Sequence, residues 1–267
     1  MPALTLHLLS LTSISAQSFV IDLRKSNTRV IVASRPRRVI ISPTILDTNT
    51  LLSEPWDLLL LLQPPSNTPD APFPPTLASR IKKEYKLPVG IPSKLLGTYP
   101  QRDAELKRNA SGIPLTGSLD KLGNVNDVGK GQNLEVSPEL FSFMNEFSRV
   151  HDAPVTMLNL LHFHEKGGKQ NYYKYGQGFN PVAAKRGGSA KLVGNVIQPA
   201  GGAQDKRPED WWNEISIVHY PSIRHFCDML AGEDYQEVNR KYRLGALKDT
   251  FLLCTTEFDV EGEAAKL

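Results

Sequence analysis

The sequence predicts an α+β fold composed of two consecutive βαββαβ units, and three observations support this prediction. Apolar segments of strand length alternate with amphipathic segments in the same order in both halves of the chain. A segment rich in Gly, Asn and Asp at residues 116–139 separates the halves. A tryptophan and a serine recur ten residues apart, at Trp56 and Ser66 and again at Trp212 and Ser222, and each serine follows a proline.

The C-terminal half shows this order most clearly. Its first helical segment ends at the Gly187-Gly188 pair, a common helix end. Ser222 is a natural cap for a second helix, which runs to about Met229, breaks at Gly232 and then resumes. In order, the predicted elements are strand 154–164, helix 169–188, strands 190–199 and 211–220, the two-part helix 222–247, and strand 249–258. This is the order of a ferredoxin-like βαββαβ unit.

The N-terminal half follows the same order less regularly. In order, the predicted elements are strand 4–12, helix 15–26, a strand or hairpin over 29–42, strand 56–64, helix 75–87 and strand 92–100. The sequence EYKL at 84–87 also resembles KYRL at 241–244, which pairs Tyr85 with Tyr242. We interpret these similarities as a degenerate tandem duplication. The predicted parts are a degenerate half at 1–105, a linker at 106–136, and a second half at 137–267, which opens with a helix capped by Ser137.

Composition excludes several classes of protein. The chain of 267 residues is 40% hydrophobic, with a net charge of +3, and it contains no arginine-rich helix or row of stacking aromatics, so we expect no nucleic-acid partner. Cys227 and Cys254 are too few for a disulfide framework and indicate reduced thiols. The leucines at 58–62 are too short a run to span a bilayer. Residues 1–16 are consistent with a signal peptide, but they lack a positive amino-terminal region, so a first strand and a cytoplasmic protein are preferred.

Several motifs of the second half resemble the domain-of-unknown-function family 1330, most closely its fungal members. They are VTMLNLLHF, YYKYG, RGGSAKLVG, WNEISIVHYPSIRHFCDML, DYQEVNRKYR and TFLLCTTE, and together they cover roughly residues 137–258. Bacterial relatives carry an arginine seven residues after the tyrosine of the DYQ motif. Here Tyr242 stands at that spacing from Tyr235, with Arg243 one residue later and Arg240 two residues earlier.

This family belongs to the dimeric α+β-barrel superfamily, so the resemblance implies two ferredoxin-like sheets packed face to face around a pocket. Two chains usually supply the sheets, but a tandem repeat can supply both, which makes the protein either a monomer with an intrachain barrel or a homodimer. In that arrangement we expect the segment around Trp212 to line the working cavity and residues 58–62 to form its apolar wall. The superfamily includes cofactor-free oxygenases, isomerases, cyclases and haem enzymes, so its fold does not determine a function.

Two polar residues in predicted strands are the candidate catalytic groups. Glu214 lies among apolar neighbours, where burial favours the protonated form and suits general acid–base chemistry. Asn159 lies in the neighbouring strand, where its amide can orient a carbonyl or phenol. The alternatives are a rim carboxylate paired with a cation and an asparagine that satisfies irregular backbone. His219 is a further candidate base, although alternation places it on the face opposite Glu214 unless a bulge intervenes.

The candidate substrate-binding residues are mostly aromatic. Tyr235 and Tyr242 recur at helical spacing, which packing onto the sheet also explains, and Arg243 suits a carboxylate. Tyr173 offers a phenol beside the first helix, and Trp212 precedes the third strand.

We expect no metal and no cofactor. His162 and His164 alternate along a strand, and His219 lies near them in the predicted topology, but no carboxylate completes a ligand set. The sequence has no phosphate-binding loop, no dinucleotide-binding glycine pattern and no nucleophile elbow.

The function predicted from these features is a cofactor-independent enzyme of secondary metabolism. It would act by proton transfer (isomerisation, cyclisation, elimination or oxygenation) on a small apolar, aromatic or polyketide-like metabolite. The alternatives are a non-catalytic protein that binds or scaffolds a small molecule and a metal- or haem-dependent enzyme.

Overall fold

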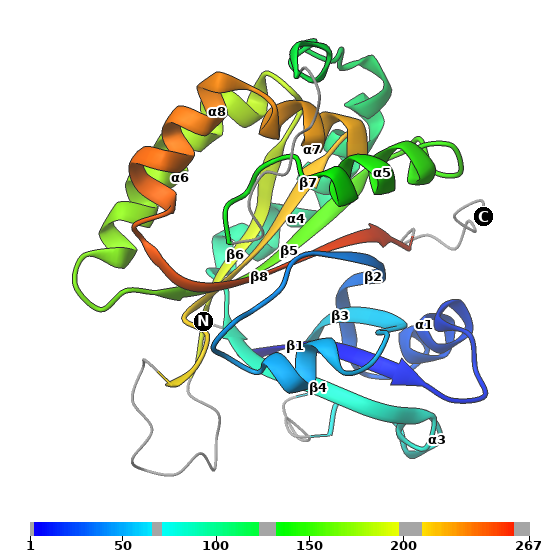
Figure 1. The fold of residues 1–267 in the computed structure, drawn as a ribbon. Helices are drawn as coiled ribbons and strands as arrows, with labels where there is room; N and C mark the ends of the chain where they lie inside the picture. The colour runs from blue at the N-terminus through cyan, green and yellow to red at the C-terminus, as the bar shows by residue number, and fades with distance from the viewer. Residues whose placement is uncertain (1–2, 66–70, 123–131, 198–209, 259–267) are drawn as a thin grey trace.

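Strands from both halves of the chain close into one antiparallel barrel. The computed structural model describes residues 3–65, 71–122, 132–197 and 210–258. Within these ranges eight strands form the closed order β1-β3-β2-β8-β5-β7-β6-β4. The first four and the last four strands are therefore each contiguous in the barrel, and they meet where β2 pairs with β8 and where β4 pairs with β6. The molecule is a mixed α/β structure with helices outside the barrel (Figure 1).

The N-terminal half supplies β1 to β4 and the helices around them. The elements are β1 (Ala3–Leu11), α1 (Ala16–Arg24), β2 (Arg29–Ile41), α2 (Thr48–Leu52), β3 (Leu58–Gln63), α3 (Pro75–Ala78), β4 (Ile81–Gly90) and α4 (Ser93–Asn109), followed by 3-10 turns at Ala110–Gly112 and Leu119–Lys121. The predicted first strand, first helix and strand at 56–64 are confirmed, and the segment 29–42 is one long strand, not a hairpin.

Two predicted elements of this half are wrong. The predicted helix at 75–87 stops at Ala78, and the segment from Ile81 is strand β4. The residues 82–86 include good helix formers, but they pair with β1 along the whole strand, and this tertiary pairing overrides local preference. The predicted strand at 92–100 belongs instead to helix α4, in which Leu96, Tyr99 and Asp103 are buried at helical spacing.

The C-terminal half contains every element that its sequence predicts. The elements are α5 (Pro138–Phe147), β5 (Val155–Phe163), α6 (Gly168–Ala184), β6 (Ser189–Val196), β7 (Glu214–Tyr220), α7 (Ile223–Leu230), α8 (Glu233–Val238), the π-helical turn η4 (Asn239–Arg243) and β8 (Leu247–Glu257). Gly187 takes a left-handed φ of 70° just after α6, as a helix-ending glycine does. Ser137 caps α5 by accepting from the amide of Leu140. Ser222 stands at the N-cap of α7, but its hydroxyl pairs with His225 Nδ1 and caps no backbone amide.

The alternation of each strand divides its side chains between the barrel interior and the outer helices. The interior is one apolar cluster to which both halves contribute, and it includes Leu6, Leu8, Leu59, Leu61, Leu158, Ile215 and Phe251. Helices α5 to α8 cover the outer face of β5, β7 and β8, and α1 and α3 cover that of β1 to β3 (Figure 1). Residues 58–62, which were expected to form a cavity wall, are core residues: Leu59 and Leu61 fill the barrel, and the other three leucines pack beneath α1.

The repeated tryptophans are equivalent in the fold, whereas the repeated tyrosines are not. Trp56 and Trp212 each lie two residues before the third strand of their half, and both belong to the interior cluster. Tyr85 lies in strand β4, but Tyr242 lies in the π-helical turn, so the expected pairing of these two segments is wrong. Ser66 lies outside the described residues.

A buried charge network ties α4 to the C-terminal half. Lys191 of β6 is fully buried and donates to carboxylates of Asp103 on α4 and Glu257 on β8, the latter at 2.6 Å. Lys107 bridges the same two carboxylates at 2.7 and 2.8 Å. Two cations thus balance two anions at the point where a helix that follows β4 meets strands β6 and β8.

The cysteines and the lengths of the helices can also be compared with the sequence. Cys227 and Cys254 are buried free thiols, as predicted. No helix in the described residues is both long and apolar enough to cross a bilayer.

Replacing Lys191 by Met tests this network. Met has a similar length, but the two buried carboxylates would then share Lys107 alone, so we expect the free energy of unfolding to fall by about 3–5 kcal/mol. Urea unfolding at neutral pH measures the change. Glu257→Gln in the Lys191→Met background restores the charge balance and should recover part of the loss. A loss below about 1 kcal/mol in the single variant, the size of an exposed ion pair, would contradict the assignment.

Candidate functional site

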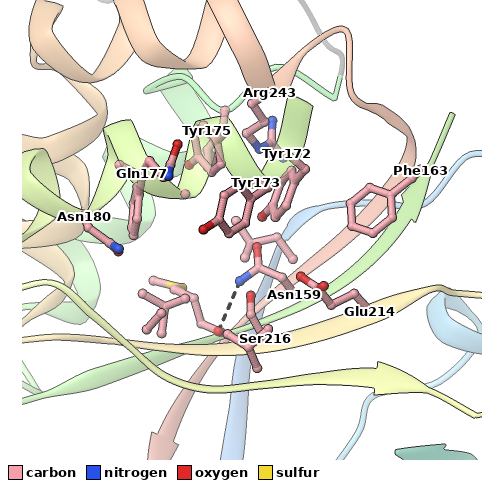
Figure 2. Close-up of a pocket in the computed structure, with 18 of the residues that line it drawn as sticks. Asn159, Phe163, Tyr172, Tyr173, Tyr175, Gln177, Asn180, Glu214, Ser216 and Arg243 are labelled. Carbon is pink, nitrogen blue, oxygen red and sulfur yellow. Dashed lines mark hydrogen bonds between the residues drawn. The ribbon is translucent and has the colours of Figure 1, made fainter. Parts of the chain in front are cut away.

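A cavity of about 400 Å³ lies outside the barrel, between the sheet of the C-terminal half and helix α6. Outward-facing residues of β5, β6 and β7 form its floor, α6 forms a wall, and Arg243 of η4 reaches it from above in Figure 2. The resemblance implied a pocket between two facing sheets, but the space between the sheets holds the interior core. The volume falls within the usual range for small-molecule sites.

The floor carries three polar side chains. Asn159 of β5 lies directly opposite Ser216 of β7, and Glu214 is the next residue of β7 on the same face. The Asn159 amide donates to the Met157 carbonyl in a long contact of 3.4 Å (dashed in Figure 2). Met157 and Val218 line the cavity beside them. The predicted meeting of Asn159 and Glu214 at one cavity is therefore present in the geometry.

One face of α6 supplies the wall. Residues at spacings of three and four line the cavity: Lys169, Tyr172, Tyr173, Gly176, Gln177 and Asn180. Tyr173 is 70% exposed and stands at the cavity mouth. Sequence reasoning named Tyr173 but missed Lys169, Gln177 and Asn180, although the helical spacing from Tyr173 was the signal that could have found them.

Glu214 is the titratable group whose surroundings are most suited to proton transfer. Burial disfavours its carboxylate and raises its pKa, and the positive charge of Lys169 partly opposes this effect. Lys169 is exposed, and its ammonium group donates to the Asn195 side chain at 2.9 Å. The cation therefore acts on Glu214 through space, without a hydrogen bond between the two side chains.

Two phenols of α6 lie close to Arg243, and one of them also lies close to Glu214. Burial raises the pKa of Tyr172 far above its usual value, and the charge of Glu214 raises it further while that of Arg243 lowers it. The Tyr172 hydroxyl therefore stays protonated and points toward Asn159 and Glu214 in Figure 2. The pKa of Tyr175 is also raised by burial, and its hydroxyl lies 3.3 Å from that of Tyr235.

A π-helical turn brings Arg243 to the cavity. In a regular α-helix Tyr242, seven residues after Tyr235, would share its face. The amide of Leu244 instead bonds to the carbonyl of Asn239, five residues back, at 3.1 Å. This wider turn accommodates one extra residue, so Arg243 rather than Tyr242 reaches the cavity.

Four predicted site residues do not line the cavity. His219 lies on the opposite face of β7, because the strand has no bulge, and its nearest charges are those of Lys191 and Glu257. Burial and Lys191 lower the His219 pKa to about 3, so it stays neutral. Trp212 is fully buried in the barrel interior, where its indole donates to Asp47 at 3.0 Å.

The two helix tyrosines are packing residues. Tyr235 is fully buried among outer-core side chains, with its hydroxyl against that of Tyr175. Tyr242 packs against the same cluster, with the ammonium group of Lys241 5.2 Å from its ring centre. The expectation that either one closes the cavity is therefore wrong; Tyr172 and Arg243 occupy that position.

The histidines form no metal centre in the described residues. His162 is buried, with Nδ1 3.1 Å from the Trp211 carbonyl, whereas His164 is exposed. Across the described ranges, no group of three or more His, Cys, Asp or Glu side chains is arranged to hold a metal ion.

Comparison with known proteins gives structural similarity only. No protein-family model matches the chain. No curated protein sequence matches it either. A protein of unknown function from Rhodopseudomonas palustris is 25% identical, over 46% of this chain and 95% of that one, with a TM-score of 0.37. A proposed monooxygenase from Lactobacillus acidophilus is 8% identical over 96% and 93%, with a TM-score of 0.46. A mutant chlorite dismutase from Candidatus Nitrospira defluvii is 10% identical over 96% and 91%, with a TM-score of 0.41. Similarity at this level assigns neither a family nor an activity.

The influence of Lys169 on Glu214 can be measured directly. Carboxyl-carbon NMR titration should give Glu214 a pKa above that of an ordinary glutamate, and Lys169→Met should raise it further because the opposing positive charge is removed. Lys166→Met removes the same charge from an exposed neighbouring position and serves as the control. A Glu214 pKa that falls or stays unchanged in Lys169→Met would contradict this electrostatic description.

Proposed function

We propose that the chain consists of two tandem ferredoxin-like halves, as in the dimeric α+β-barrel superfamily and in family 1330. The strand order supports this proposal, since β4-β1-β3-β2 and β8-β5-β7-β6 place the first to fourth strands of each half identically. The equivalent positions of Trp56 and Trp212 support it as well. Because one chain supplies both sheets, we propose a cytoplasmic monomer in which a linker at 106–136 joins one half at 1–105 to the other at 137–267.

We propose that the protein is a cofactor-independent enzyme that moves a proton on a small apolar or aromatic metabolite. The observation that carries this proposal is the placement of Glu214. Its carboxyl group lies at the edge of a largely apolar cavity, where burial raises its pKa toward the range useful for a general base at neutral pH. Structural ion pairs also perturb pKa values, but Glu214 forms no ion pair with any described residue, which favours a chemical role.

In the proposed reaction Glu214 accepts a proton from an acidic C–H of the substrate. The electron pair of that bond moves onto an adjacent carbonyl oxygen, giving an enolate. The Tyr172 hydroxyl, held protonated by burial, and the Asn159 amide are the donors available to stabilise this oxygen. Where a C=C bond adjoins the acidic carbon, the enolate is conjugated with it, and return of the same proton from Glu214 to the far carbon of that bond shifts the double bond and completes an isomerisation without any external oxidant or cofactor.

Deuterium exchange tests this function without knowledge of the natural substrate. In D2O the protein should accelerate exchange at the acidic C–H of at least one member of a panel of enolisable aryl ketones, 1,3-diketones and aryl 2-oxo acids, followed by NMR. Glu214→Gln keeps the shape but removes the base, so the exchange rate should fall about 100-fold or more, with thermal unfolding nearly unchanged.

Glu165→Gln is the matched control, because it removes an exposed carboxylate that follows β5 and should keep the full rate. An unchanged rate in Glu214→Gln would refute the assignment. Tight binding of panel members without exchange by the unmodified protein would instead identify a non-catalytic binding protein.

A further inference from the structure

Arg243 is a buried cation that borders the cavity with one donor unused. Its side chain is 2% exposed. Its Nη1 donates to the carbonyl of Gln132 at 3.2 Å, but Nη2 is buried and has no hydrogen-bond partner. A guanidinium stays ionised at any physiological pH, so this site holds an uncompensated positive charge. Leaving a buried charge unpaired is costly, and proteins rarely do so without a reason.

The fold neutralises its other fully buried cations. Arg186, 3% exposed, pairs with Asp228 at 3.4 Å and with Asp234 at 3.0 Å. Lys191 pairs with Asp103 and Glu257. Among the described residues no carboxylate forms an ion pair with Arg243, and it is this cation that faces the cavity. The contrast indicates that the described side chains do not neutralise Arg243 and that a ligand in the adjoining cavity can do so.

The neighbouring side chains do not supply a compensating negative charge. The positive charge of Arg243 acts on the phenols of Tyr172, Tyr175 and Tyr235. Burial raises the pKa of each phenol, so all three remain neutral donors. The charge of Glu214 also acts on the pKa of Tyr172, so the Arg243 cation and the Glu214 carboxyl group both lie near this one phenol. In Figure 2 the Arg243 guanidinium lies above Tyr172, and Glu214 lies below it.

We infer that the ligand of this cavity is a small apolar molecule bearing a single carboxylate. The carboxylate accepts from Nη2 of Arg243, and the apolar body extends past Tyr172 over Met157 and Val218 toward Glu214. One free donor nitrogen on one buried cation fits a monoanion rather than a phosphate, which takes several donors. The inference rests on the proposed use of this cavity, and it narrows the substrate to an aryl or alkenyl acid whose acidic C–H lies remote from its carboxylate.

Matched acid and amide probes test this inference by binding alone. Calorimetry with benzoate, cinnamate and 1-naphthoate, each against its primary amide, should show at least one acid bound about 10- to 100-fold more tightly than its amide, the range for a hydrogen bond to a charged group. Arg243→Met should abolish this preference and leave amide affinity unchanged, while Arg243→Lys should retain part of it. The preference should also weaken as salt concentration rises.

Arg240→Met is the control, since Arg240 lies in the same turn but is exposed and paired with Glu233. If the role of Arg243 were only structural, its replacement would lower the melting temperature. An arginine kept for a ligand should leave the melting temperature of Arg243→Met equal or higher, because an unpaired buried charge is lost. Equal binding of acid and amide, an acid preference that survives Arg243→Met, or failure of every acid to bind the unmodified protein would each overturn the inference.

These outcomes are separable from those of the proposed reaction. Glu214→Gln should keep the acid preference even though it loses proton exchange, since Arg243 is untouched. If Glu214→Gln leaves the exchange rate unchanged while the acid preference depends on Arg243, the reaction is refuted and the carboxylate site stands.

Discussion

Both halves of the chain must fill one barrel interior, and this constraint determines where a ligand can be held. Leucines of β1 and β3 pack there against Leu158, Ile215 and Phe251 of the second half. Apolar side chains at inward-facing positions are therefore committed to the core, since protein interiors are densely packed, and the inward-facing His219 is buried as well. Polar groups that act on a ligand are left to the outward positions, where Asn159, Ser216 and Glu214 lie beneath α6.

The second half was largely predictable because its local signals agree with its tertiary environment. The alternation of β7 separates Glu214 from Ile215, and it places Ile215 and Ile217 in the interior cluster but Val218 and Tyr220 in the outer one. The Gly187 helix end and the Ser137 cap are local features that need no tertiary contact. For the same reason alternation predicted correctly that His219 and Glu214 lie on opposite faces, even though His219 was retained as a candidate.

The remaining features depend on contacts that a sequence does not display. The segment 81–90 becomes a strand because β1 and β6 flank it, and α4 is held by a charge network with two strands that follow far later in the chain. Arg243 reaches the cavity through a π-helical turn, which has no reliable sequence signature. Regular helical periodicity therefore favoured Tyr235 and Tyr242, which pack in the outer core, whereas Arg243, named for its chemistry alone, lines the cavity.

The position of β8 has a consequence for the order of assembly. This strand lies between β2 and β5, and it joins the two halves through contacts such as that of Arg37 with Thr256, 219 positions apart. Such high contact order slows folding, because chain entropy must be lost before the contacts form. During synthesis the first seven strands precede β8, so the barrel stays open until this strand emerges. Until then the edge of β2 has no partner strand. In the nascent chain this unpaired edge is accessible to chaperones and prone to aggregation.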